Sequence, residues 1–382
     1  MNEKVLFVDD DPTVLATYQR LLRRQFTVDT ALGGLGALDA VQRRGPYAVV
    51  VADMEMPGMN GIGLLVQVQD RFPDTVRVML TGRASLETAV EAVNEGNVFR
   101  FPNEDRAMWA EFLDGLPPDL MHKEHAEVLY FVGCVSSFSP AIQEIPQAFL
   151  QVLLKAGMDV ALLAGKERCC GFPLIMGGLA GDAQALIEHN MAELRRLGAK
   201  TVVFNCPSCY YTWKKYYPVE GIRLAHAAEV IRDLVEEGRL VFETASLPVT
   251  YHDPCDLGRG LGVFDAPRKV LRRFASEGYV ELTPSRSAAL CCGGGGDVEM
   301  WDPDLVAGVN SLLTDAVVKT GAGMLVQGCP QCKRVTQRGL ESRGAGIRTL
   351  DIAELALEFG TFTANQREPE TARQEGVAAW RR

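Results

Sequence analysis

The chain has 382 residues, of which 47% are hydrophobic and 23% are charged, a composition typical of a globular protein with two to three domains. Its net charge of −10 argues against nucleic acid or an anionic membrane surface as the main partner. No apolar run reaches the roughly 18 residues of a transmembrane segment, and the first residues lead into an apolar strand rather than a signal peptide. We therefore expect a soluble cytoplasmic protein.

Residues 1–116 alternate short apolar runs with amphipathic segments. The expected strands are Val5–Val8, Ala48–Ala52, Val76–Leu80 and Val98–Phe101. Between the first two runs, apolar residues recur at the spacing of an amphipathic helix. Strands that alternate with helices predict an α/β fold with a doubly wound parallel sheet, whose functional site lies at the carboxyl ends of the strands.

Polar side chains stand at those strand ends. Asp9 and Asp10 follow the first strand, Asp53 ends the second, and Thr81 follows the third. Three carboxylates at one edge of a sheet repel one another unless a hard cation lies among them, and oxygen ligands suit Mg²⁺. The sequence therefore predicts a Mg²⁺ site formed by Asp9, Asp10 and Asp53.

This stretch resembles the receiver domain of response regulators, including the loop at residues 54–61. The resemblance implies that Asp9 and Asp10 are the acidic pair, that Asp53 is the phospho-acceptor, and that Thr81 and Phe101 are the switch residues. It also implies a histidine kinase as a partner.

Glu104 departs from the family pattern, because the family has a lysine three residues after the switch aromatic. That lysine normally pairs with the phosphorylated aspartate, whereas a carboxylate would repel an aspartyl phosphate or bind metal. We therefore favour a docking or tuning role for this domain over control by phosphorylation.

The ten cysteines form two matched sets of five. The first set is Cys134, Cys169, Cys170, Cys206 and Cys209, and the second is Cys255, Cys291, Cys292, Cys329 and Cys332. Each cysteine of the second set follows its counterpart by 121 to 123 residues, which indicates an internal repeat. Glycine follows both vicinal pairs and lets the backbone approach a ligand closely.

Three interpretations of these sets compete. Disulfide frameworks are typical of small secreted chains. Zinc sites need four ligands, and five cysteines with a vicinal pair is one too many. Iron–sulfur ligation by thiolates accounts for the soft ligands, the glycines and the duplication, and we favour it.

The pattern Cys…Cys-Cys-Gly…Cys-Pro-x-Cys, present twice, resembles the cysteine-rich catalytic subunit of heterodisulfide reductases over about residues 127–360. Residues 251–259 also match the segment around the first ligand of the family's second repeat. The resemblance implies two non-cubane 4Fe-4S clusters, one held by each set of five cysteines. It further implies that the two clusters cleave a disulfide by binding one sulfur each. Related domains occur in complexes that oxidise glycolate, lactate and glycerol-3-phosphate.

Each cysteine-rich repeat is expected to be a Rossmann-like α/β domain with its ligands at strand ends. The expected strands are Val128–Val132, Val160–Leu163, Thr201–Phe204, Val249–His252 and Met324–Val326. The expected helices are Ile142–Ala156, Ala183–Leu197, Pro267–Ser276 and Asp304–Thr320. We place the receiver-like domain at residues 1–116, a linker at 117–126, the repeats at 127–245 and 246–360, and a disordered tail at 361–382.

His252 precedes Cys255 by three residues and is a candidate proton donor to a departing thiolate. The alternative, which we favour, is a histidine hydrogen-bonded near a strand end. The leading functional hypothesis is an iron–sulfur oxidoreductase subunit that acts on a small disulfide or thiol. No ferredoxin-type cysteine spacing is present, so electrons are expected from an iron–sulfur or flavin subunit. The alternatives are a redox-sensing signalling protein and an electron-transfer subunit of an organic-acid dehydrogenase.

Overall fold

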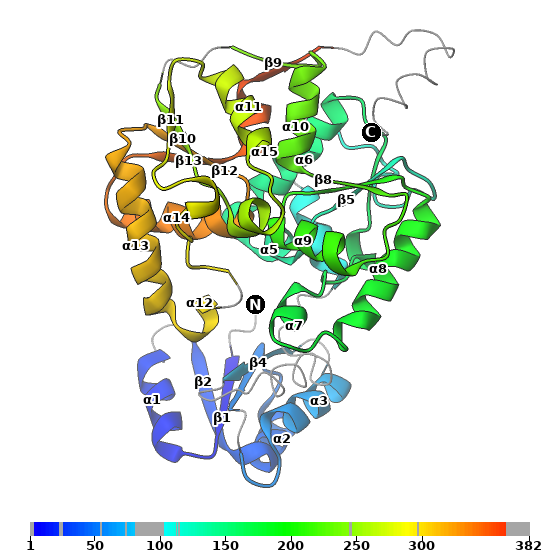
Figure 1. Ribbon diagram of the computed structural model, residues 1–382. Helices are drawn as coiled ribbons and strands as arrows, with labels where there is room; N and C mark the ends of the chain where they lie inside the picture. Colours follow the sequence, from blue (N-terminus) through cyan, green and yellow to red (C-terminus); the bar gives the residue numbers. More distant parts are fainter. Residues whose placement is uncertain are drawn as a thin grey trace. The chain divides into compact units, whose positions relative to one another are not determined.

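The computed structural model describes residues 4–22, 26–53, 56–72, 75–80, 103–111, 113, 115–243, 247–295 and 298–363 (Figure 1). The chain forms two compact units, Met1–Phe101 and Pro102–Arg382, which are considered separately below. The expected strand Val98–Phe101 and the predicted switch residues Thr81 and Phe101 lie outside the described residues.

The first unit is built on one parallel sheet of four strands. The strands are β1 (Lys4–Asp9), β2 (Thr27–Leu32), β3 (Val49–Asp53) and β4 (Val76–Leu80), in the spatial order β2-β1-β3-β4. The helices are α1 (Pro12–Leu22), α2 (Gly33–Arg44) and α3 (Gly61–Arg71). All neighbouring strands run parallel. The α/β fold predicted from the sequence is confirmed.

The apolar run of β1 contributes to two cores. Leu6 and Val8 are buried together with residues of α2 and α3. Val5 and Phe7 pack instead with Leu15 of α1. Successive side chains of a strand point to opposite faces of the sheet, so a continuous apolar run is what a sheet covered on both faces requires.

The second unit contains two further parallel sheets. One has the order β6-β5-β7-β8 and consists of β5 (Val128–Phe131), β6 (Val160–Leu162), β7 (Thr201–Phe204) and β8 (Arg223–His226). The other has the order β11-β10-β12-β13 and consists of β10 (Val249–Tyr251), β11 (Tyr279–Glu281), β12 (Met324–Gln327) and β13 (Arg348–Asp351). In each of the three sheets the first and third strands are therefore neighbours, and ligands of such folds bind in the crevice at their carboxyl ends.

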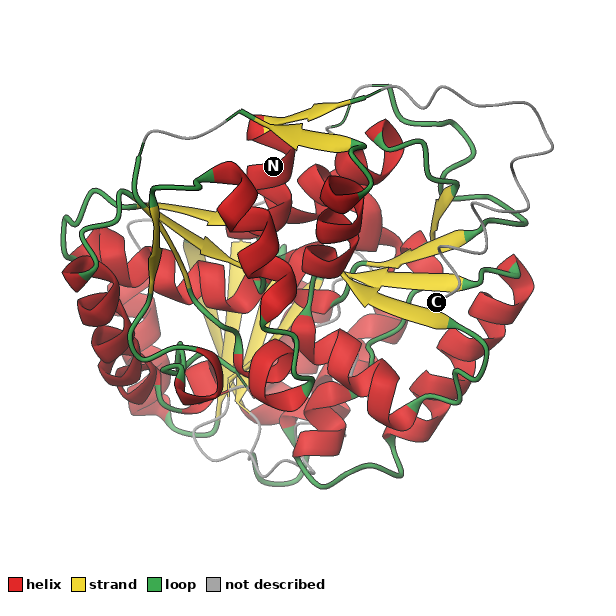
Figure 2. Ribbon diagram, turned by 45° about the horizontal axis from the view of Figure 1, so that its top comes forward, coloured by secondary structure: helices red, strands yellow, loops and turns green. Residues whose placement is uncertain are grey.

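Helices of the second unit flank these sheets (Figure 2). The first repeat contains α5 (Cys134–Phe138), η2 (Pro140–Ile142), α6 (Glu144–Lys155), η3 (Ala164–Lys166), α7 (Phe172–Met176), α8 (Ala183–Leu197), α9 (Pro207–Tyr216) and α10 (Ala227–Glu236). The second contains the π-helical turn η4 (Asp256–Gly260), α11 (Asp265–Phe274), η5 (Arg286–Ala288), α12 (Val298–Trp301), α13 (Pro303–Lys319), α14 (Pro330–Ser342) and α15 (Ile352–Phe359).

Local signals fix where the helices after the central and edge strands begin. α9 and α14 start with Pro207 and Pro330, at the helical position where a missing N–H costs nothing. α10 and α15 start with capping boxes, in which Glu229 and Glu354 accept hydrogen bonds from the backbone of the cap residue. The same pair of devices therefore appears at corresponding places in both repeats.

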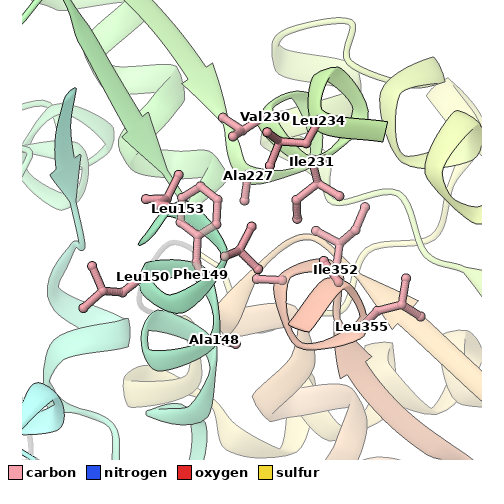
Figure 3. Close-up of a cluster of buried hydrophobic side chains, with 14 of the residues drawn as sticks. Ala148, Phe149, Leu150, Leu153, Ala227, Val230, Ile231, Leu234, Ile352 and Leu355 are labelled. Carbon is pink, nitrogen blue, oxygen red and sulfur yellow. The ribbon is translucent and has the colours of Figure 1, made fainter. Parts of the chain in front are cut away.

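The two repeats share one hydrophobic core. Figure 3 shows Phe149 and Leu153 of α6 meeting Ile231 of α10 and Ile352 and Leu355 of α15, all buried in the same cluster. An antiparallel pair, β9 (Leu240–Phe242) with β14 (Gly360–Phe362), also joins the end of each repeat. Because burial of apolar area is the main favourable term in folding, the repeats form one folding unit.

The boundary between the two units lies earlier than expected. The 3₁₀ helix η1 (Asn103–Ala110), expected in the receiver-like domain at residues 1–116, belongs to the second unit, where it packs against η3, α5 and α6. Trp109 and Leu120 are buried in the shared core. The composition around Pro117 and Pro118 predicts a linker at residues 117–126. Burial of the apolar Leu120 side chain instead holds this segment on the core.

The end of the described chain also differs slightly from expectation. Thr361 and Phe362 were assigned to the tail, yet they form part of β14. The rest of the predicted tail, residues 364–382, lies outside the described residues. Among the helices that the structure describes, none is both long and apolar enough to cross a membrane.

Candidate metal centres

Acidic side chains meet at the carboxyl end of the sheet in the first unit. Asp9 and Asp53 are the last residues of the neighbouring strands β1 and β3. Burial raises the pKa of Asp9, and the charges of Asp53 and Asp10 raise it further against the hydrogen bond from the Asp11 amide. Within the described ranges, however, no three His, Cys, Asp or Glu side chains surround a position for a single ion. The Mg²⁺ site stays a prediction.

The five cysteines of the first set converge at the crevice of their sheet. They follow β5, β6 and β7, and neighbouring thiols shift one another's pKa values in the order Cys134, Cys169, Cys170, Cys209 and Cys206. Cys170 and Cys209 are buried, and the other three are half-buried. Contact with Cys169 and Cys209 lowers the pKa of Cys170 to about 6, whereas the pKa values of Cys134, Cys169 and Cys209 are raised.

The second set repeats this arrangement. Neighbouring thiols shift one another's pKa values in the order Cys255, Cys291, Cys292, Cys332 and Cys329, and Cys332 Sγ donates to Cys292 Sγ at 3.2 Å. Cys291 is exposed, whereas Cys292, Cys329 and Cys332 are buried. All ten cysteines, each of them within the described ranges, are unpaired, so the disulfide interpretation is not supported.

Backbone groups around both vicinal pairs point at sulfur. The amide of Gly171 donates to Cys169 Sγ at 3.5 Å, and the amide of Gly293 donates to Cys291 Sγ at 3.3 Å. Both glycines have positive φ, 90° and 85°, which other residues adopt only with strain. A Cβ atom at Gly133 would lie 2.9 Å from the sulfur of Cys209. Soft thiolates with amide donors and a close backbone suit an iron–sulfur cluster.

The Cys-Pro-x-Cys motifs place two thiols at the start of a helix. Cys206 and Cys329 are the cap residues of α9 and α14, and the amide of Cys332 donates to Cys329 Sγ at 3.4 Å. The amino-terminal end of a helix carries partial positive charge and stabilises thiolates. Of the thiols in these two motifs, Cys206 has a lowered pKa, caused first by Cys209 and then by backbone amides of the first turn, whereas the pKa values of Cys209 and Cys332 are raised.

A buried asparagine holds each vicinal pair from the following long helix. Asn190 of α8 donates to the carbonyl of Cys169 at 3.2 Å and to the hydroxyl of Tyr217 at 3.1 Å. Asn310 of α13 donates to the carbonyl of Cys292 at 3.2 Å. Neither asparagine was predicted from the sequence. A polar residue on the apolar face of the corresponding helix in each repeat is the signal that could have revealed them.

An arginine and a glutamate lie beside the first set. Arg106 of η1 donates to Glu167 Oε1 at 3.0 Å and to Cys134 Sγ at 3.4 Å. Burial opposes its charge, but Cys134 and Glu167 together raise the pKa of Arg106 above its usual value, so it remains a cation. Arg106 and Glu167 are 61 residues apart in the sequence, and no local pattern announces the pair.

His252 is buried beside the second set. Its Nε2 donates to the carbonyl of Leu290 at 2.9 Å, and its Nδ1 accepts a hydrogen bond from Gln327 at 3.1 Å. Burial lowers its pKa, so the ring is neutral. Both ring nitrogens are engaged by the chain, which is the arrangement of a structural histidine and gives no support to a role as proton donor.

Buried polar groups lie next to one ligand of each set. Tyr130 donates to the side chain of Asn205, which directly precedes Cys206, and Asn205 O accepts from His226 Nε2 at 2.8 Å. A Cβ atom on Gly328, which directly precedes Cys329, would lie 3.3 Å from the His226 ring and 3.2 Å from the hydroxyl of Tyr251. The His226 ring therefore packs against the residue before Cys329 while it is hydrogen-bonded to the residue before Cys206.

Comparison with known proteins agrees with this geometry. Residues 5–99 match the response regulator receiver domain, and residues 128–214 and 249–335 match the cysteine-rich domain. The chain carries one receiver domain and two cysteine-rich domains. The resemblances proposed from the sequence motifs are thereby confirmed.

The cysteine-rich part is related to components of oxidoreductases. One component of the dihydromethanophenazine:CoB–CoM heterodisulfide reductase of Methanosarcina mazei is 34% identical over 271 residues, which cover 69% of this chain and 64% of the relative. EtfAB:quinone oxidoreductase of Syntrophomonas wolfei is 30% identical over 258 residues, which cover 64% of this chain and 35% of that protein. The chain thus spans less than two thirds of the length of these relatives.

Among solved structures, the adenylate cyclase of Rhodopirellula baltica is 44% identical to the matched part. The match covers 26% of this chain and 74% of that one, with a TM-score of 0.25.

Proposed function

We propose that this chain is an iron–sulfur oxidoreductase subunit in which each set of five cysteines holds one non-cubane 4Fe-4S cluster. The observation that carries the proposal is that both sets are complete and converge in the same order at equivalent crevices. Relatives of the cysteine-rich part include a component of a heterodisulfide reductase. By analogy, the substrate would be a small disulfide or the corresponding thiols.

The residues of the chain would divide the work as follows. The bound clusters would supply single electrons and iron sites for sulfur. The ten cysteines would hold them, the helix starts at Pro207 and Pro330 would stabilise the thiolates, and Asn190 and Asn310 would fix the vicinal loops. Electrons would come from a partner subunit that contains iron–sulfur or flavin groups. The first unit would dock that partner or tune the activity, with Mg²⁺ at Asp9, Asp10 and Asp53 and a histidine kinase as a further partner.

The test is to measure iron and acid-labile sulfide after anaerobic purification, followed by EPR after oxidation with candidate thiols. About eight irons, from two four-iron clusters, and a thiol-dependent signal are expected. Zinc in place of iron, or a single cluster that ignores thiols, would overturn the proposal.

A second candidate function is redox sensing, in which the cysteine-rich unit responds to oxidation and the receiver domain reports it. The observation that favours it is that η1, which follows the first unit directly, contacts Cys134. Phosphorylation of Asp53, or partner binding, that depends on cluster oxidation would support this function, whereas disulfide turnover with reduced viologen would favour the enzyme.

A further inference from the structure

One buried ion pair holds both the sulfur and the backbone of the first ligand. The guanidinium of Arg106 donates to Cys134 Sγ at 3.4 Å and to Glu167 Oε1 at 3.0 Å, and the two side chains are 5% and 1% exposed. Glu167 in turn accepts hydrogen bonds from the amides of Val132 and Gly133, both at 2.9 Å. These two residues directly precede Cys134, so the pair fixes the loop as well as the thiol.

Among the described residues of the second repeat, no ion pair takes this place. The position that corresponds to Glu167 is Ala289, whose carbonyl accepts a hydrogen bond from Arg259 at 2.6 Å. Cys255, the counterpart of Cys134, donates to the carboxylate of Asp256 at 3.8 Å, and Asp256 also accepts from Ser208 of the first repeat at 2.6 Å. The thiol of Cys134 therefore contacts a cation, which is paired with Glu167, whereas the thiol of Cys255 contacts an anion.

We propose that Arg106 is a positioning residue of the first cysteine set, which orders the Cys134 loop and gives a cluster bound there a higher reduction potential than one bound by the second set. A nearby buried cation stabilises the more negative, reduced state, and a nearby anion opposes it. The redox part of this inference rests on the function proposed above.

The redox test measures the reduction potentials of the full chain by EPR-monitored titration. It compares the wild type with single and double variants that remove the charge of Arg106, of Glu167 or of both. R106Q is expected to lower the potential of the higher-potential cluster by at least about 59 mV, a tenfold change in the equilibrium constant for one electron. E167Q should raise it, and R106K should stay near the wild-type value. The double variant R106Q/E167Q should lower it by less than R106Q does, because of the two charges only Arg106 contacts the thiol. R348Q, at an exposed pair with Glu358, is the matched control.

The possible results distinguish a redox effect of Arg106 from a folding defect and from a failure to bind iron. An unchanged higher potential in R106Q, or a shift only in the lower one, would overturn the redox inference. The double variant leaves no buried charge unpaired, so it guards against misreading a folding defect as a redox effect. If no iron binds at all, the proposed function fails and the redox inference fails with it.

Amide hydrogen exchange tests, independently of iron, whether Arg106 orders the loop before Cys134. R106Q and E167Q are expected to lose protection at Val132 and Gly133 at least tenfold, because those amides lose an ordered acceptor. Protection equal to that of R348Q would show that Arg106 does not order the loop.

Discussion

The two cysteine sets have the same ligands on the same sheet topology, but they differ in the charges and solvent around them. The first set is sheltered, with Arg106 and Glu167 at Cys134. In the second set Cys291 is exposed, Cys255 faces Asp256, and the neighbouring histidine is neutral. The two repeats therefore share the cysteine pattern but differ in the charges beside it. Under the proposed function, two like clusters would thus be given unlike redox properties by side chains that do not bind the metal.

The largest expected effect follows from removing one buried ligand from each set. Cys170→Ala and Cys292→Ala delete equivalent sulfurs, and each should abolish the cluster of its own repeat while sparing the other, leaving about half of the iron. Iron and sulfide analysis with EPR checks this. If either variant loses all iron, the two sites are not independent. Circular dichroism of both variants controls for misfolding.

Trp109→Ala tests whether η1 is as integral to the first repeat as α11 is to the second. Trp109 is buried and packs edge-on against Tyr130 at 6.4 Å, so its loss should cost about 3–5 kcal/mol of unfolding free energy. Phe274→Ala, at a buried ring between Phe242 and Phe359, should cost a similar amount. Urea unfolding followed by far-UV circular dichroism is the measurement. A cost below about 1 kcal/mol for Trp109→Ala would make η1 peripheral.

The cap residues of α10 and α15 should give the repeats opposite pH dependence. Burial lowers the pKa of His226 to about 4, so the unfolded state binds the proton more readily. Stability should rise with pH between about 4 and 6.5, by at most about 3 kcal/mol. Burial raises the pKa of Asp351 to about 8, so here the native state binds the proton more readily. Stability should fall as pH rises from about 4 towards 8.

Two substitutions separate these contributions, which oppose each other between about pH 4 and 6.5. His226→Asn should leave a stability that falls from about pH 4 to 8, whereas Asp351→Asn should leave one that rises from about pH 4 to 6.5 and should stabilise the protein at pH 8. Thermal or urea unfolding from pH 4 to 8 measures both slopes. A stability curve of Asp351→Asn parallel to that of the wild type would show that this carboxyl is ionised in the fold.

The smallest effect is expected at the two asparagines. Asn190→Ala should destabilise by about 1–3 kcal/mol, because it leaves several buried groups unpaired, including the Cys169 carbonyl. Asn310→Ala removes the bond to the Cys292 carbonyl and should cost about 1 kcal/mol. Urea unfolding at a single pH compares the free energies of unfolding of the two variants. Equal costs would show that the extra bonds of Asn190 contribute little. Ser342→Ala, on the exposed side of α14, provides a baseline.

Features that depend on local pattern could be predicted from the sequence. The central strands β5, β7, β10 and β12 are apolar runs, and the cysteine spacing alone revealed the repeat and placed its ligands at strand ends. The short strands β8 and β13 escaped notice because their first residues are partly or fully exposed arginines rather than apolar residues.

Features that depend on long-range contacts could not be predicted from the sequence. Arg106 meets Glu167 across 61 residues, and Ser208 meets Asp256 across 48, without any periodic signal. The segment around Pro117 has the composition of a linker, and only the packing of Trp109 and Leu120 shows otherwise. Pairings of this kind are decided by the tertiary fold, which overrides local preference.

The shared strand order of the three sheets has a consequence for how such chains change over time. At the carboxyl ends of the first and third strands, Asp53 raises the pKa of Asp9 in one sheet, and in another a Cβ atom on Gly133, directly before Cys134, would lie 3.7 Å from Cys206 Cβ. Under the function proposed above, the choice between hard oxygen and soft sulfur donors would therefore rest on a few positions at these strand ends. One scaffold could consequently acquire new inorganic chemistry by substitutions at its strand ends that leave most of its packing unchanged.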